Sequence, residues 1–347
     1  MDHSELTGSA SRPGATKRKR IALSQGQLVS ESFLSDGGTL PLLLEPAVEG
    51  LSLLDWAASN QQHLEQQLLR YGAILFRGFN VNTVDGFEQF MKSLAGELLD
   101  YSYRSTPRTQ VSGKIYTSTE YPAHQTIPLH NEMSYTRQWP MMLGFFCIEV
   151  AEEDGETPIA DSRKVFQRID GSIRDRFTRR GVRYVRNYGE ALDLTWQNVF
   201  QTDDRVEVED FCRRAGIEFE WKSDERLCTS EVCQAIAEHP QTGEMVWFNQ
   251  AHLFHVSSLK SEIRDSLLTS SGGEPPRNAF YGDGTPIDEA DLEEIRAAYE
   301  KEAVVFPWQK GDVLLVDNML TAHGRRPYRG ARRIVVGMGR PFANQAA

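Results

Sequence analysis

Two short fragments that lie far apart in the chain constrain its fold more than any other feature. One is His130-Asn131-Glu132, in the segment PLHNEMSY, and the other is His323, which follows the apolar run GDVLLVDN at 311–318. Alternate residues of a strand point to the same side, so His130 and Glu132 can face one interior. If His323 ends a second strand at the same mouth of a β-structure, two imidazoles and one carboxylate meet there. Such a set predicts a metal site.

A basic pair and a threonine predict the other half of such a site. Arg332 and Arg333 open the apolar run RRIVVGMG at 332–339, and Thr157 follows a Gly-Glu turn in EEDGETPIADS. An arginine inside a β-structure is costly unless an anion neutralises it. An arginine with a hydroxyl therefore predicts an anchor for the far carboxylate of a keto acid whose other end chelates the metal. Two histidines and one carboxylate that leave coordination positions open are the arrangement of non-heme Fe(II) oxygenases.

The pattern of apolar residues predicts strands with helices inserted between them. Helical spacing occurs in four segments, at 53–71, 84–99, 162–169 and 288–303. Strand patterns occur at 73–79, 141–150, 311–318 and 332–339, with a hairpin at 232–250 that turns at Pro240–Gly243. This order predicts a mainly β fold with α insertions, a cupin-like jelly roll flanked by helices. The charged and aromatic segment 170–230 is predicted to be an insertion that forms a lid over the mouth.

Composition bounds the remaining possibilities. Residues 1–25 are rich in Ser, Gly and basic residues and are predicted to be a disordered tail before one domain at 40–342. The net charge of −11 argues against a nucleic-acid binder. The four cysteines form no CxxC motif, which favours free thiols in a reducing cytoplasm. The sequence shows no long apolar run and no secretory leader, so we expect a cytoplasmic protein without a membrane span. It indicates no oligomeric state.

Taken together, these motifs resemble the taurine-dioxygenase-like family of Fe(II)/2-oxoglutarate oxygenases, over roughly residues 40–342. The resemblance is strongest to the branch with syringomycin-type aspartyl hydroxylases and clavaminate-synthase-like members. It implies a double-stranded β-helix, with Fe(II), 2-oxoglutarate and O2 as cofactor and co-substrates. By this resemblance the metal ligands are His130, Glu132 and His323. The 2-oxoglutarate-binding arginine falls best on Arg333, the second of the pair with Arg332, and the co-substrate-binding threonine falls on Thr157.

Two positions depart from the most common pattern of this family. Most members have Asp at the acidic ligand, but Glu132 matches the form found in clavaminate-synthase-like members. Gly337 stands where taurine dioxygenase has a sulfonate-binding arginine, so a taurine-like sulfonate is not expected as the substrate.

The resemblance also implies a class of reaction and of substrate. The reaction is hydroxylation, desaturation or ring closure at an unactivated C–H bond, with 2-oxoglutarate converted to succinate and CO2. The substrate is a small amino acid or amino-acid derivative, free or tethered to a carrier protein, in natural-product biosynthesis. Four residues near the motifs are candidate substrate contacts: Asn249, Tyr135, Arg137 and His255. Two alternatives stay open at this point, a catalytically silent cupin-like binding module and a hydrolytic zinc enzyme with the same three ligands. The zinc enzyme gives no role to a buried arginine.

Overall fold

The computed structural model describes residues 28–35, 37–101, 103, 105–106, 108–189, 194–222, 226–270 and 274–344. The predicted disordered tail at 1–25 lies outside these residues. No helix in the described part of the chain is long and apolar enough to cross a membrane.

The largest sheet has eight strands, in the order β1-β2-β3-β16-β7-β19-β5-β4. Their bounds are β1 (Val29–Phe33), β2 (Leu42–Pro46), β3 (Ala73–Phe76), β16 (Val313–Asp317), β7 (Gln138–Glu149), β19 (Arg333–Ala343), β5 (Ile115–Thr117) and β4 (Gln110–Ser112). The central strands β3 and β16 are buried along their whole length, which explains their continuous apolar sequence. Since both faces of such strands are covered, apolar residues dominate both faces, and the one polar residue of β16, Asp317 at its end, accepts from the N–H groups of Met319 and Leu320.

Three helices near the N-terminus pack on one face of this sheet: α1 (Leu53–Ser59), α2 (Gln61–Tyr71) and α3 (Val84–Ala95). The sequence predicted one helix over 53–71, but the structure has two, because Asn60 leaves the helical conformation and its side-chain Nδ2 donates to Trp56 O at 2.7 Å. The third helix ends earlier than predicted, at Gly96, whose φ of 74° is a conformation that glycine adopts readily.

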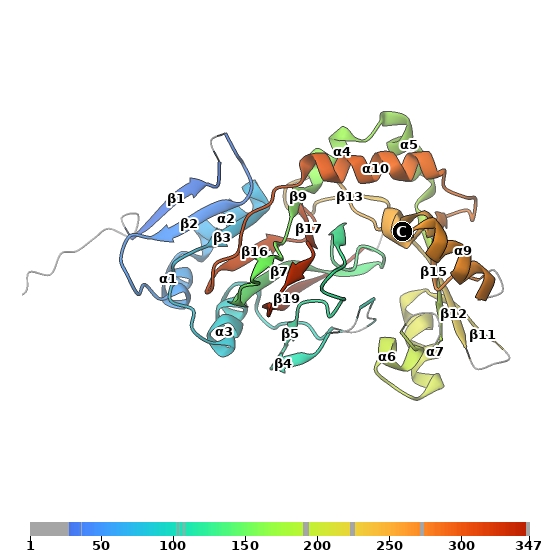
Figure 1. Cartoon of the computed structure of the whole chain (residues 1–347), viewed down its shortest axis with the longest axis horizontal. Helices are drawn as coiled ribbons and strands as arrows, with labels where there is room; N and C mark the ends of the chain where they lie inside the picture. Colours follow the sequence, from blue (N-terminus) through green and yellow to red (C-terminus); the bar gives the residue numbers. More distant parts are fainter. Residues whose placement is uncertain are drawn as a thin grey trace, which may run out of the picture.

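A three-stranded sheet packs against the large one and carries the metal-site motif. It consists of β6 (Ile127–His130), β17 (Thr321–Arg325) and β9 (Ile159–Asp161), in the order β6-β17-β9. A hydrophobic cluster joins the two sheets, with Ile159 of β9 packed among residues such as Leu314, Phe145 and Val336. Two packed β-sheets flanked by helices confirm the predicted jelly-roll class (Figure 1).

A four-stranded sheet lies to one side of these layers, at the right of Figure 1. Its strands are β10 (Val182–Tyr188), β11 (Glu218–Trp221), β12 (Leu227–Cys233) and β15 (Arg277–Tyr281). It shares one hydrophobic cluster with α6 (Trp196–Phe200), α7 (Arg205–Ala215) and residues of the three-stranded sheet such as Leu129 and Ala160. The segment predicted as a lid therefore forms a packed β-structure, completed by β15 from later in the chain.

The remaining elements connect these sheets. The predicted hairpin is present as β13 (Ile236–Glu238) and β14 (Met245–Trp247), followed by α8 (Ala251–Phe254), a 3₁₀ turn (Val256–Ser258) and α9 (Ser261–Ser270). The predicted helices appear as α4 (Ser162–Arg168) and α10 (Glu289–Glu302), which pack together, with α5 (Gly171–Arg180) close by (Figure 1). A short pair, β8 (Glu153–Asp154) and β18 (Tyr328–Arg329), completes the fold.

Candidate active site

The predicted metal ligands meet at the end of the three-stranded sheet. His130, the last residue of β6, is paired directly with His323 of β17, and Glu132 follows two residues after His130. One ligand atom from each of the three residues lies within 4.8 Å of the others. Glu132 Oε2 is 3.9 Å from His323 Nε2. The structure brings the three predicted ligands together, but Glu132 lies in a turn beyond the strand end rather than in the strand itself.

Asn318 holds the turn that carries Glu132. Its Oδ1 accepts from the backbone N–H of Glu132 at 2.7 Å, and its Nδ2 donates to the carbonyls of Glu132 and Pro140, each at 2.8 Å. Asn131 Nδ2 donates in return to the carbonyl of Asn318 at 2.6 Å. Asn318 is completely buried, so these bonds do not compete with water and they stabilise the position of the carboxylate-bearing residue. Sequence reasoning missed this role.

Both imidazoles are prepared for metal binding. His130 Nδ1 lies 2.8 Å from the carbonyl of Pro128, which can only accept, so Nδ1 carries the proton and Nε2 keeps its lone pair. Burial lowers the pKa of His130, and it lowers that of His323 well below the ordinary value. The neutral form, which is the one that binds metals, therefore prevails at neutral pH. Gly324 permits the close approach of the two strands, because a Cβ there would lie 2.7 Å from the carbonyl of Ile127.

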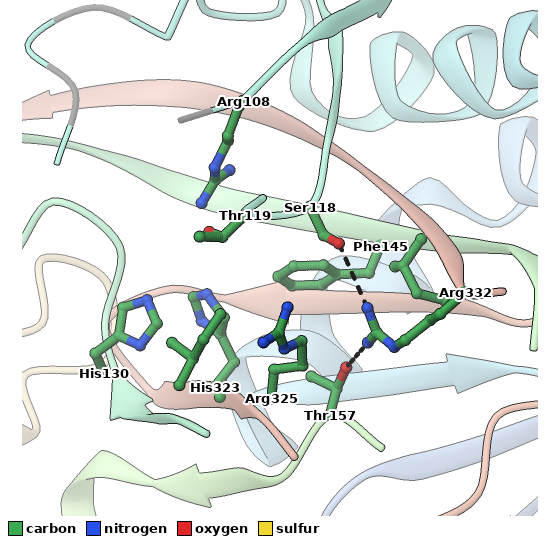
Figure 2. Close-up of a pocket in the computed structure, with 12 residues that line it drawn as sticks. Arg108, Ser118, Thr119, His130, Phe145, Thr157, His323, Arg325 and Arg332 are labelled. Atoms are coloured by element: carbon green, nitrogen blue, oxygen red, sulfur yellow. Dashed lines mark hydrogen bonds between the residues drawn. The ribbon is translucent and has the colours of Figure 1, made fainter. Parts of the chain in front are cut away.

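At the other end of the same pocket lies the half-buried guanidinium of Arg332 (Figure 2). Arg332 donates to the carbonyl of Gly155 at 2.7 Å, and its two terminal nitrogens lie 3.4 Å from the hydroxyls of Thr157 and Ser118. Burial, aided by the nearby charge of Arg325, lowers the pKa of Arg332 to about 10, so it stays protonated at neutral pH. Within the described residues Arg332 makes no ion pair. A half-buried cation with neutral partners is a site for an anion.

The structure corrects the choice between the two adjacent arginines. Arg332 and Ile334 both line the pocket, whereas Arg333 between them is exposed and opposite Glu149 of β7. Because alternate residues of an extended chain point to opposite sides, a pocket that takes Arg332 cannot also take Arg333. Of the two predicted arginines, the sequence favoured Arg333, but it is Arg332 whose guanidinium lies beside Thr157 in the pocket.

Two of the four residues predicted to contact substrate lie inside the four-stranded-sheet region instead. Tyr135 is buried, donates its hydroxyl to the carbonyl of Tyr103 at 3.1 Å and packs on the ring of Phe254. Arg137 donates from Nε to the carbonyl of Val232 at 3.0 Å. Neither side chain is among those that line the pocket.

The other two are occupied with backbone groups. Asn249 is fully buried, donates to the carbonyl of Ala235 at 2.8 Å and accepts from the N–H of Ala251 at 3.0 Å. His255 accepts the N–H of Ser257 on Nδ1 at 3.1 Å, which caps the 3₁₀ turn. The pocket does not include either residue. Their buried polar groups support local backbone structure.

Two further arginines line the pocket, and sequence reasoning missed both. Arg325 lies two residues after His323 on β17, and it donates at 2.7–2.9 Å to three backbone carbonyls, those of Tyr121, Pro122 and Gln125. Arg108 forms an ion pair with Glu132 at 2.5 Å. The sequence did contain a signal for Arg325, because residues two apart on a strand point to the same side and Arg325 lies two residues after His323. Arg108 comes from the irregular segment before β4, where no periodic pattern indicated its direction.

Comparison with known proteins decides the family. A family model described as "Taurine catabolism dioxygenase TauD, TfdA family" matches residues 39–338. The chain belongs to this family. It is 43% identical over 276 residues to the dapdiamide synthesis protein DdaC of Enterobacter agglomerans, covering 79% of this chain and 84% of that protein. It is 31% identical to a clavaminate synthase-like protein of Arabidopsis thaliana, covering 83% and 88%.

Solved structures show the same fold. PvcB, described as an Fe, alpha-ketoglutarate dependent oxygenase from an isonitrile synthetic pathway, aligns with a TM-score of 0.55 at 16% identity and covers 94% of this chain and 98% of its own. A taurine dioxygenase from Burkholderia xenovorans aligns with a TM-score of 0.52 at 16% identity, covering 92% and 96%.

This protein is therefore a 2-oxoglutarate-dependent dioxygenase that uses Fe(II), 2-oxoglutarate and O2. This confirms the family, the enzyme class and the cofactors expected from the sequence. The residues present fit both groups: two imidazole nitrogens and a carboxylate oxygen suit a non-heme iron, and the half-buried Arg332, which makes no ion pair among the described residues, suits a dicarboxylic acid. One pocket joins the two groups, because His130, His323, Thr157 and Arg332 all line it.

Proposed function

We propose that His130, Glu132 and His323 bind Fe(II), and that Arg332 with Thr157 binds the distal carboxylate of 2-oxoglutarate. The mutual distances of the triad and the half-buried guanidinium at the other end of one pocket support these roles. When bound, iron and 2-oxoglutarate would supply the oxidising chemistry: O2 is consumed, 2-oxoglutarate becomes succinate and CO2, and the second oxygen atom either enters the substrate (hydroxylation) or leaves as water with two substrate hydrogen atoms (desaturation or ring closure).

The residues of this chain contribute position and a dry environment. Thr157 Oγ1 accepts from Trp308 Nε1 at 3.0 Å and lies 3.4 Å from Arg332 Nη2. These contacts orient the side chains of Thr157 and Arg332 toward the pocket. Ile127, Phe145 and Ile334 supply apolar walls between the two polar ends. Such walls exclude water from the reacting atoms, which strengthens the charged contacts and suppresses side reactions.

For the substrate, we propose an amino acid or a carrier-tethered aminoacyl group, with hydroxylation, desaturation or ring closure at an unactivated C–H bond in natural-product biosynthesis. The observation that carries this proposal is the 43% identity with DdaC, over four fifths of the chain, since that relative is described as a dapdiamide synthesis protein. The domain division belongs to the same proposal: one oxygenase unit at 40–342, in which the lid at about 170–230 governs which substrate enters.

The test is succinate release by the iron-loaded protein, measured with free amino acids, carrier-bound aminoacyl groups and sulfonates as separate panels. We expect stimulation by at least one member of the first two panels. Stimulation only by carrier-bound groups selects the tethered form. Stimulation by taurine and by none of the amino-acid compounds would refute the substrate class while leaving the oxygenase chemistry intact.

A further inference from the structure

The metal ligand His130 lies at the end of an edge strand. β6 is hydrogen-bonded to β17 on one side and to no other strand among the described residues. An edge strand leaves backbone carbonyls on its free side, and in a buried region each of them needs a donor. Leu129 and Asn131, on either side of His130 in the chain, are both buried. Ser134 Oγ, within the turn that follows, donates to the Asn131 carbonyl at 2.9 Å, but this contact is local to the turn.

Donors from outside the turn come from the short helix α8 and its N-cap residue. His252 Nε2 lies 3.0 Å from the carbonyl of Leu129, which can only accept, so Nε2 carries a proton and donates. Gln250 Nε2 donates to the carbonyl of Asn131 at 2.8 Å. Both side chains are buried, so these bonds do not compete with water. The two carbonyls that flank His130 are therefore held by side chains of one short segment.

That segment is itself fixed from two sides. The backbone N–H of Gln250 donates to the hydroxyl of Tyr184, on β10 of the four-stranded sheet, at 2.7 Å. Arg296 of α10 donates to the carbonyl of His252, at 3.1 Å from Nε and at 2.9 Å from Nη2. The ring of His252 stacks on that of Tyr299, with ring centroids 4.7 Å apart and an interplanar angle of 27°. α8 therefore connects β10 and α10 to the backbone of the metal site.

The position of this backbone decides the direction of the His130 ring. The Nδ1 of His130 is oriented by the carbonyl of Pro128, so the ring turns with the chain of β6. Its ligand atom meets those of Glu132 and His323 within 4.8 Å only while this segment keeps its place. Groups that orient a metal ligand without touching the metal typically change metal affinity 10- to 100-fold when they are removed.

We propose that Gln250 and His252 are positioning residues for the iron ligand His130, which they hold through the two carbonyls beside it. This inference rests on the proposed function, since it concerns the same metal site. Neither side chain lines the pocket, so both act through His130 and not on a substrate. α8 thereby transmits the positions of the four-stranded sheet and of α10 to the metal.

The experiment measures anaerobic Co(II) binding by the metal-free full chain. Co(II) accepts the same nitrogen and oxygen ligands, and its visible absorption bands report ligand geometry without any turnover. Gln250→Met and His252→Phe each remove one donor at nearly constant volume, and the phenylalanine keeps a ring on Tyr299. His252→Gln restores an N–H donor of similar reach. Asn187→Leu is the matched control, because it removes a buried side-chain bond of 2.8 Å to the carbonyl of Pro275, away from the triad.

We expect Gln250→Met and His252→Phe each to weaken Co(II) binding about 10- to 100-fold and to shift the visible bands. His252→Gln should recover most of the affinity. Asn187→Leu should bind Co(II) as the wild type does, although its thermal stability falls by a similar amount. Circular dichroism verifies folding. If Gln250→Met does not fold, Gln250→Asn carries the test, because its amide is one methylene too short to reach the Asn131 carbonyl.

Wild-type Co(II) affinity and wild-type bands in both Gln250→Met and His252→Phe overturn the inference. An equal loss of affinity in Asn187→Leu overturns it as well, since the effect would then follow from lowered stability in general. Failure of the proposed function gives a different result, because His323→Ala would then bind Co(II) as tightly as the wild type.

Discussion

The pocket and the four-stranded sheet both bury charged side chains, but they do so in different ways. In the pocket, Arg332 lies at an open cavity with neutral partners. In the four-stranded sheet, Arg186 lies within 6 Å of the ring centroids of Tyr103, Tyr135 and Tyr188. Aromatic faces stabilise that cation in place. Buried charge alone therefore does not mark a ligand site. A buried cation marks one only where a cavity lies beside it.

The largest expected effect tests the metal end of the pocket. Replacing His323 with alanine removes one of three ligands and should abolish succinate formation, with iron content falling in parallel, because two ligands bind Fe(II) poorly. The far-ultraviolet circular dichroism should stay close to that of the wild type. The control is His255→Ala, outside the pocket. Wild-type turnover in His323→Ala would show that the triad is not the iron site.

The second prediction concerns the anion end of the pocket. Arg332→Ala should raise the apparent constant for 2-oxoglutarate by roughly 30- to 4,000-fold, because losing a buried charge-assisted pair costs about 2–5 kcal/mol. The neighbouring Arg333→Ala should change it by less than about twofold, since Arg333 is exposed. Steady-state assays with varied 2-oxoglutarate measure both. A raised constant for 2-oxoglutarate in Arg333→Ala but not in Arg332→Ala would show that Arg333, not Arg332, binds the carboxylate.

The third prediction turns to the four-stranded sheet. Burial raises the pKa of Glu231 from its ordinary value of 4.5 to about 7, against the opposing effects of Cys233, Arg137 and Arg186. Between pH 4.5 and 7 the folded state keeps a proton that the unfolded state has lost, so this contribution to stability is present below pH 4.5 and disappears as the pH rises through 7. Its size is on the order of 3 kcal/mol.

Glu231→Gln removes this titration. Denaturant unfolding at pH 5 and pH 8 should show a smaller loss of stability with rising pH than in the wild type, by on the order of 2–3 kcal/mol. The exposed Glu238→Gln on β13 is the matched control and should leave the pH dependence as it is. An equal pH dependence in Glu231→Gln and the wild type would mean that Glu231 ionises normally in the folded protein.

The smallest predicted effect separates a structural tyrosine from a substrate contact. Tyr135→Phe deletes the hydrogen bond to the buried carbonyl of Tyr103 and should cost about 1 kcal/mol of stability. The Michaelis constants for 2-oxoglutarate and substrate should not change, because Tyr135 does not line the pocket. A thermal melt and a kinetic assay on the same preparation distinguish a structural role of Tyr135 from a role in substrate binding. A raised substrate constant without a stability loss would restore Tyr135 as a substrate contact.

The sequence predicted most of the fold because its apolar runs are unambiguous. The buried strands β3 and β16 and the helix α10 lie close to their predicted bounds. The split at Asn60 was not predictable from periodicity, since the apolar spacing continues through it. The four substrate candidates failed to reach the pocket for a related reason: position near a motif in the chain says little about the direction of a side chain.

What the sequence determined by itself was the chemistry available: two histidines and a glutamate at spacings that fit a metal, and a basic pair with a threonine that fit a carboxylate. The tertiary structure decided which atoms meet. It selected Arg332 over Arg333 and brought Arg108 onto Glu132 from a segment without periodic pattern. The physical reason is that residue type sets what a group can bind, whereas strand phase and loop path, which depend on contacts across the whole chain, set where it points.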